Sequence, residues 1–188
     1  MAPNSTNMGG FYDVGAMQKI AINLFYGWGY NFYRKENQLR ADDQLVRARA
    51  GELLGQAAAS LVVAESDYRR EHLPPPTRDK PRPDAEAMAN AQALERLGRD
   101  LSALKGRLAA LPVPENDRMM QRYRNEAETL AALVTVDEQL IGQAEMLRVA
   151  LQDKDGEAVL AEMALLQEGL AAIGETLRQR AAALGPRG

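Results

Sequence analysis

The feature that most constrains the fold is a leucine repeat in the middle of the chain. This repeat places one apolar side chain on the same face of an α-helix at every turn, which is the seam of helical bundles and coiled coils. Such a seam must be covered, so at least one further helix with a matching stripe is required. The leucines follow one another at steps of three and four residues: Leu94, Leu97, Leu101, Leu104, Leu108 and Leu111.

Three further segments carry stripes of the same kind. Residues 36–72, 115–152 and 155–184 repeat Leu, Val, Ile, Met or Ala, mostly at three- and four-residue steps. Two of the boundaries between these helices are marked by proline, which cannot continue a helix. They lie at the proline-rich linker 73–83 and at Pro112. The sequence therefore predicts four long helices joined by short connections.

Asp84 and Asp155 stand where helix N-caps are expected, immediately before two of these segments. Because the four helices have comparable lengths, we predict an all-α protein that forms an antiparallel four-helix bundle of long helical hairpins. An aromatic-rich helical extension precedes this bundle. The expected organisation is a flexible tail (1–13), an aromatic docking segment (14–35), the bundle (36–184, with its linker at 73–83) and a C-terminal tail (185–188).

Composition argues against several classes of function. A net charge of −3 disfavours a general nucleic-acid binder. The chain has no cysteine, which removes disulfides, thiolate metal sites and thiol nucleophiles. Abundant alanine, and arginine in excess over lysine, fit a GC-rich bacterial genome.

Candidate catalytic and metal-binding residues are few. The single histidine, His72, lies at a helix end beside the linker, where it complements the helix dipole. The Glu-x-x-His motif of di-iron bundles does not occur in the sequence. Asp153-x-Asp155-Gly156 lacks the later ligands of a calcium loop and predicts a turn. We therefore expect no catalytic residue, metal, cofactor or small-molecule substrate.

One acidic residue, Asp137, falls inside an apolar helix face. A buried carboxylate there is expected to pair with an arginine from a neighbouring helix, and the alternative is a proton or metal site of a carboxylate-based enzyme. Thr135 and Glu138 have the spacing of a capping box, which would interrupt the helix. We predict that the helix is continuous.

Aromatic residues concentrate at the N-terminal end of the chain. If residues 14–35 continue the first helix, they extend about 30 Å past its neighbours, and an exposed apolar surface of that size must be covered. Trp, Tyr and Arg are favoured anchors of protein interfaces. We expect this segment to bind a protein partner or a second copy. The residues assigned to partner binding are Phe25, Tyr26, Trp28, Tyr30, Phe32 and Tyr33, with Arg34 and Lys35 as a polar rim.

Two alternatives remain open for the aromatic segment. Its rings can fold back and seal one end of the bundle. They can also lie in a membrane interface, since aromatic residues followed by Arg and Lys are common there. The apolar run from Ile20 to Tyr33 spans 14 residues, whereas crossing a membrane takes about 20. The expected location is cytoplasmic, possibly with membrane association.

Overall fold

The computed structural model describes residues 10–27, 39–78, 81–111 and 126–184, and all regular structure within these ranges is helical. The expectation of an all-α protein is confirmed. The helices are α1 (Val14–Gly27), α2 (Leu39–His72), α3 (Ala85–Ala109), α4 (Glu126–Leu151), α5 (Gly156–Ala161) and α6 (Met163–Leu184).

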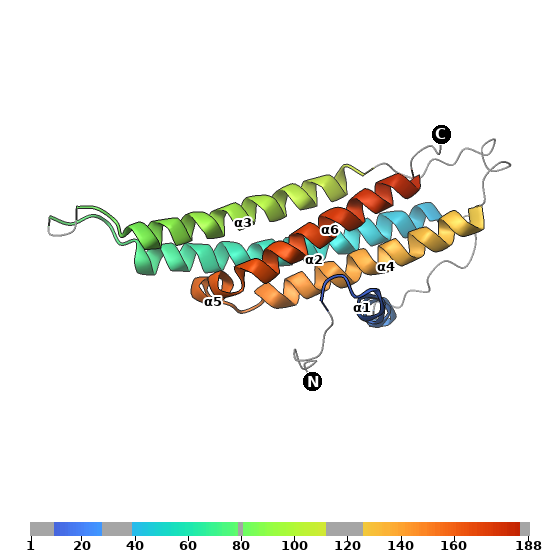
Figure 1. Cartoon of the computed structure of the whole chain (residues 1–188), viewed down its shortest axis with the longest axis horizontal. Helices are drawn as coiled ribbons and strands as arrows, with labels where there is room; N and C mark the ends of the chain where they lie inside the picture. Colours follow the sequence, from blue (N-terminus) through green and yellow to red (C-terminus); the bar gives the residue numbers. More distant parts are fainter. Residues whose placement is uncertain (1–9, 28–38, 79–80, 112–125, 185–188) are drawn as a thin grey trace.

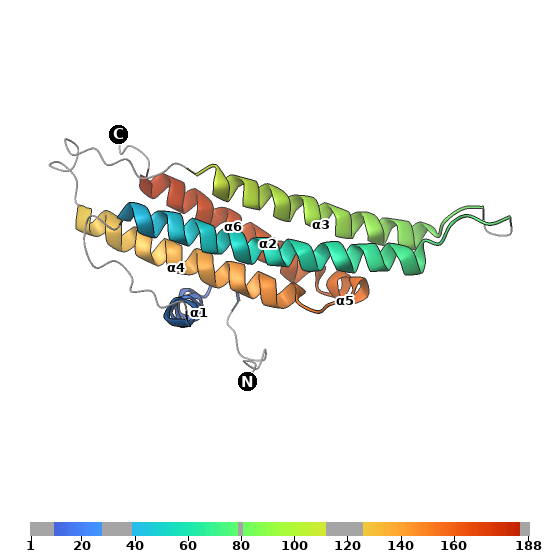
Figure 2. The same cartoon turned by 180° about the vertical axis from the view of Figure 1, so that it is seen from behind.

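The four long helices lie side by side along the long axis of the molecule (Figure 1). Each runs in the opposite direction to the one before it, as the colours in Figure 1 show. Helix α4 packs against α1, α2 and α6, while α3 packs against α2 and also contacts α6. Seen from behind, α2 runs along the near side between α3 and α4 (Figure 2).

The helix starts after the connections follow local capping chemistry. The Asp84 carboxylate accepts a hydrogen bond from the Ala87 amide at 2.8 Å, and the Asp155 carboxylate accepts one from the Ala158 amide at 2.8 Å. Each interaction satisfies one of the amide groups that the first helical turn leaves without an intrahelical partner. Both predicted caps are therefore confirmed.

The apolar stripes form the core of the protein. The leucine repeat of α3 is buried from Leu94 to Leu108, and Leu111 is partly buried beside it. Its leucines meet stripes from α2, α5 and α6, and two of them line a hollow together with leucines of α4 and α6. The helices therefore cover one another's apolar faces. The buried residues contributed by the other bundle helices include Val46, Ala50, Leu53, Ala57, Leu61, Ala64, Leu140, Ile141, Ala144, Leu147, Leu151, Val159, Leu166, Leu170, Ile173 and Leu177.

The structure also tests where the last two predicted helices are continuous and where they are interrupted. Helix α4 is continuous through Thr135, as predicted, so the capping-box spacing is not used. The last predicted helix is instead divided at Glu162, whose backbone leaves the regular helical range with φ −102° and ψ 13°. The Glu162 carboxylate pairs with Lys154 from the turn after α4, and this contact accompanies the break between α5 and α6.

The N-terminal segment differs from the expected extension. Helix α1 does not continue α2 past the ends of its neighbours, because it packs on α4. Both views show α1 nearly end-on, whereas α4 lies along the long axis, so α1 crosses α4 steeply (Figures 1 and 2). The physical reason is that α1 has its own apolar stripe, which is buried on the bundle.

Candidate functional site

Helix α1 is attached to the long helices by one continuous apolar stripe. Met17, Ala21 and Phe25 follow one another at four-residue steps and are buried, as is Phe11 just before the helix. Four-residue spacing places these side chains on one face of a helix, which is the face that meets a groove in helix-in-groove recognition. We call residues 10–27 the N-terminal strap.

Two glycines in the bundle make room for the strap. A β-carbon on Gly142 of α4 would lie 2.6 Å from the Met17 carbonyl oxygen, so the backbones of α1 and α4 touch here. A β-carbon on Gly169 of α6 would lie 2.7 Å from the Phe11 ring. Because both distances are shorter than van der Waals contact, only glycine fits at these positions while the strap lies where it does.

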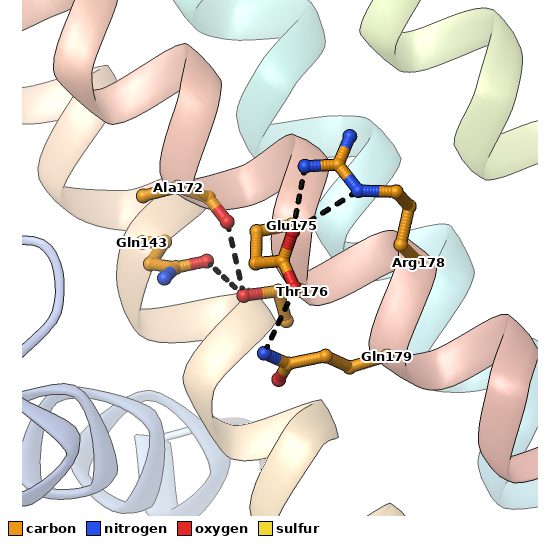
Figure 3. Close-up of polar contacts among 6 residues, drawn as sticks. All are labelled: Gln143, Ala172, Glu175, Thr176, Arg178 and Gln179. Carbon is orange, nitrogen blue, oxygen red and sulfur yellow. Dashed lines mark hydrogen bonds and ion pairs between the residues drawn. The ribbon is translucent and has the colours of Figure 1, made fainter.

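Polar side chains lie directly beneath the strap. The Gln143 amide donates a hydrogen bond from Nε2 to the Phe11 carbonyl oxygen at 3.0 Å. The Thr176 hydroxyl on α6 lies 2.9 Å from Gln143 Oε1 and 3.1 Å from the Ala172 carbonyl oxygen. Figure 3 shows Thr176 directed toward Gln143, while Glu175, Arg178 and Gln179 form a separate cluster on the same helix. Gln143 therefore links the strap to both α4 and α6.

An ion pair lies in the same interface between α4 and α6. Arg180 Nε donates to Asp137 Oδ1 at 2.7 Å, and each side chain is 1% exposed. The expectation that Asp137 pairs with an arginine of a neighbouring helix is confirmed. Such a pair is held together strongly because separating either charge from its partner inside the protein is costly.

Glu138 is the next residue of α4 and faces the strap. It is 7% exposed, and its side chain hydrogen-bonds Gln18 of α1. Burial raises the pKa of the Glu138 carboxyl, an effect that the Gln18 hydrogen bond opposes and the nearby Asp137 charge reinforces. We call Asp137, Glu138, Gln143, Thr176 and Arg180 the polar layer.

Of the residues assigned to partner binding, the structure places one side chain. Phe25 is 1% exposed and packs in the core, as the fold-back alternative expects for this ring. Tyr26 belongs to α1, but its side chain lies outside the described residues. The remaining assigned residues also lie outside them: Trp28, Tyr30, Phe32, Tyr33, Arg34 and Lys35.

The single histidine, His72, takes a structural role. The His72 ring stacks on Tyr68 with 4.3 Å between ring centres, and its Nε2 lies 3.5 Å from Glu157. No group of three His, Asp or Glu side chains in the described ranges is arranged to hold a metal ion. The hollow among six leucines of α3, α4 and α6 has no room for a water molecule. The glycines and polar side chains beneath the strap are therefore suited to holding helix α1 in place.

Sequence reasoning found Asp137 but missed most of the polar layer. Thr176 and Arg180 interrupt the apolar side of α6 four residues apart, on the face that also carries Ile173 and Leu177. That spacing was a usable signal. Gly142 and Gln143 gave no comparable signal, because their role depends on a crossing helix that lies more than a hundred residues away in sequence.

Comparison with protein-family models, curated proteins and solved structures finds no match to this chain. Among the described helices, none combines the length and apolar character needed to cross a membrane.

Proposed function

We propose that this protein is a non-enzymatic scaffold or accessory subunit that binds a protein partner through its aromatic segment. In this proposal the four long helices form a closed antiparallel four-helix bundle that acts as a rigid body. The ring-bearing residues from Trp28 to Tyr33 are the anchors, and Arg34 and Lys35 form the polar rim. A cytoplasmic location follows from the same proposal.

The observation that supports this proposal is the attachment of the strap. Phe25 is buried only three residues before Trp28, and α2 begins at Leu39. The chain therefore joins the aromatic residues at both ends to described helices. Tethering of this kind lowers the entropy lost when anchor residues bind.

The side-chain chemistry of the segment fits a protein interface. Tyr and Trp offer a large apolar surface with a polar tip, and few rotatable bonds are frozen when they bind. Aromatic side chains next to basic ones are also common at membrane interfaces, so a peripheral membrane protein is the second candidate. One variant series distinguishes the two.

The test compares Trp28→Ala with Tyr12→Ala, which removes an exposed aromatic from the strap instead. Each tagged protein is purified natively from its source cells, and the stoichiometric partner is then reconstituted with the purified chain. We expect Trp28→Ala to weaken this complex by more than about tenfold, whereas Tyr12→Ala binds normally. Circular dichroism should be the same for both.

The alternatives give other results. A membrane-interface role predicts a blue shift of the fluorescence of Trp28, the only tryptophan, on addition of anionic liposomes. If neither a partner nor liposomes respond to Trp28→Ala, and that variant instead melts at a lower temperature, the aromatic residues belong to the core and the proposal is wrong.

A further inference from the structure

The outer face of α2 lacks charge where a solvent-facing helix normally carries it. No residue from Leu53 to Ala64 is charged. Five of these twelve residues are buried, but Gln56, Ala59, Val62 and Val63 are exposed, and the two valines are each 60% exposed. By contrast, the exposed side of α3 is rich in Arg, Glu and Asp. The two adjacent valines and the uncharged residues around them form a small apolar patch on the exposed side of α2.

The exposed face has an internal symmetry. Six exposed residues follow one another at alternating steps of four and three, which places them on one stripe. Positions at equal distances from residue 61 are compatible in pairs: an acidic residue corresponds to a basic one, a polar residue to a polar one, and an apolar residue to an apolar one. The stripe consists of Glu52, Gln56, Ala59, Val63, Ser66 and Arg70.

We infer that a second copy of this chain packs its α2 antiparallel against this face, about a two-fold axis at residue 61. In that arrangement Ala59 faces Val63 of the second copy, and Gln56 faces Ser66. Because the axis generates every contact twice, Glu52 of each copy meets Arg70 of the other. The contact runs over 52–70, about 27 Å of helix, and Val62 borders it in both copies.

Charge complementarity selects this register and direction. A parallel pairing in the same register would place Glu52 against Glu52 and Arg70 against Arg70, which is repulsive. The antiparallel pairing places opposite charges at both ends. Within one chain Glu52 contacts Arg49 at 2.9 Å and Arg70 contacts Asp67 at 2.5 Å, but these pairs are exposed. Exposed pairs are weak and are readily shared with a further partner.

Figure 2 shows that α2 lies along the near side of the molecule, flanked by α3 and α4. A partner can therefore approach this face without moving a described helix. The contact involves one helix from each copy, which is a small interface, so a dissociation constant on the order of 10 µM is expected. The dimer would present two aromatic segments, a property independent of what those segments bind.

The first test is sedimentation of the full chain from about 1 µM to about 300 µM, a range that spans the expected constant. We expect a reversible monomer–dimer equilibrium. Val62→Glu/Val63→Glu should weaken it by at least about 100-fold, because four exposed valines leave the contact. A matched control, Ala89→Glu/Ala103→Glu, adds the same charge to exposed positions of α3 and should leave the equilibrium unchanged.

A charge exchange tests the register. Glu52→Arg and Arg70→Glu should each weaken the dimer about tenfold, since each places like charges together twice, and the double variant should restore it. Because the chain has no cysteine, Ala59→Cys and Val63→Cys can be mixed as separately tagged proteins. They should form a mixed disulfide faster than either variant forms one with itself.

Several outcomes overturn the inference. A chain that stays monomeric at the highest concentration has no such contact. A dimer that survives Val62→Glu/Val63→Glu uses another face, and loss of that dimer with Trp28→Ala assigns it to the aromatic segment. If the double charge variant fails to restore the dimer, the antiparallel register is wrong.

Discussion

The α2–α3 pair and the α4–α6 pair contain similar helices but differ in what lies between them. Between α2 and α3 the buried side chains are mostly apolar. The polar contacts there include the part-buried hydrogen bond that Asn90 donates to the Tyr68 hydroxyl at 3.1 Å and the pair of Arg69 with Glu95 at 3.0 Å, and neither of these is a buried ion pair. Between α4 and α6 the core contains Asp137 with Arg180 and Gln143 with Thr176. The strap lies over this second pair, and Gln143 reaches it directly.

The two kinds of interface constrain the helices to different degrees. An apolar stripe favours burial against almost any other stripe, and a shift by one turn costs it little. A buried ion pair or hydrogen-bonded pair forms at only one alignment of the two helices. Any shift of one helix along the other leaves charges or hydrogen-bonding groups without partners. The polar layer therefore fixes the register of α4, α6 and the strap, whereas leucine packing supplies most of the burial throughout.

The strongest test of this division is Asp137→Ala. It leaves the Arg180 charge in the core without its carboxylate and should lower the free energy of unfolding by about 3–5 kcal/mol, measured by urea denaturation. Asp137→Leu/Arg180→Met removes both charges and should recover most of that loss.

The matched control for Asp137→Ala is Glu175→Ala. Glu175 pairs with Arg178 at 2.6 Å on the surface of α6, the helix that also carries Arg180. The hydrogen bond from Arg178 lowers the pKa of the Glu175 carboxyl. Its replacement should leave the urea midpoint unchanged, because solvent screens the pair. Equal losses for the two variants would contradict a special role for the buried pair.

Sequence reasoning succeeded where one helix carries the whole signal. The leucine repeat of α3 and the caps Asp84 and Asp155 could be predicted, because spacing and local hydrogen bonding decide them. Burial of Asp137 could also be predicted, since its position falls inside an apolar face. The choice of Arg180 could not, because Arg178 is as close in sequence and only the packing register separates them.

The strap shows where sequence reasoning failed. An aromatic, apolar segment must cover its surface, but composition does not say whether the cover is this chain or another molecule. The deciding feature is the complementary backbone of α4 at Gly142, and a glycine inside a helix ordinarily indicates only a lower helix propensity. Steric fit between distant segments has no signature in either segment alone.

Gly142→Ala tests that fit. Its β-carbon would lie 2.6 Å from the Met17 carbonyl oxygen, so the strap must shift or detach, at a cost of about 1–3 kcal/mol. Trypsin should then cut faster after Lys19, which is exposed in α1. Gly106→Ala in α3 is the control, because no atom lies within 4 Å of its β-carbon. That change should stabilise the protein by up to about 1 kcal/mol, through helix propensity.

Thr176→Val tests the contribution of a single hydrogen bond of the polar layer. The variant keeps the shape of the side chain but removes the hydroxyl that contacts Gln143 Oε1, so it should cost about 1–2 kcal/mol. Ser102→Ala removes a hydroxyl that bonds the Gly98 carbonyl on the exposed side of α3, and thermal unfolding should barely change. If both variants behave alike, the polar layer contributes no more than a surface hydrogen bond.

The smallest expected effect is the pH response of Glu138. Because burial raises its pKa above the ordinary 4.5, the folded state binds this proton more tightly than the unfolded state. The stabilisation from this site is fully present below pH 4.5 and is lost as pH rises through the raised pKa. Ionisation of Glu138 therefore places a charge beneath the strap that opposes folding.

Glu138→Gln removes that charge and retains a side chain able to bond Gln18. Above the raised pKa of Glu138 it should increase the melting temperature, and the gain should shrink toward zero as the pH approaches 4.5. Glu168→Gln makes the same change at an exposed position of α6 and is the control. A gain of equal size at every pH would mean that Glu138→Gln acts through packing, and that the charge beneath the strap does not oppose folding.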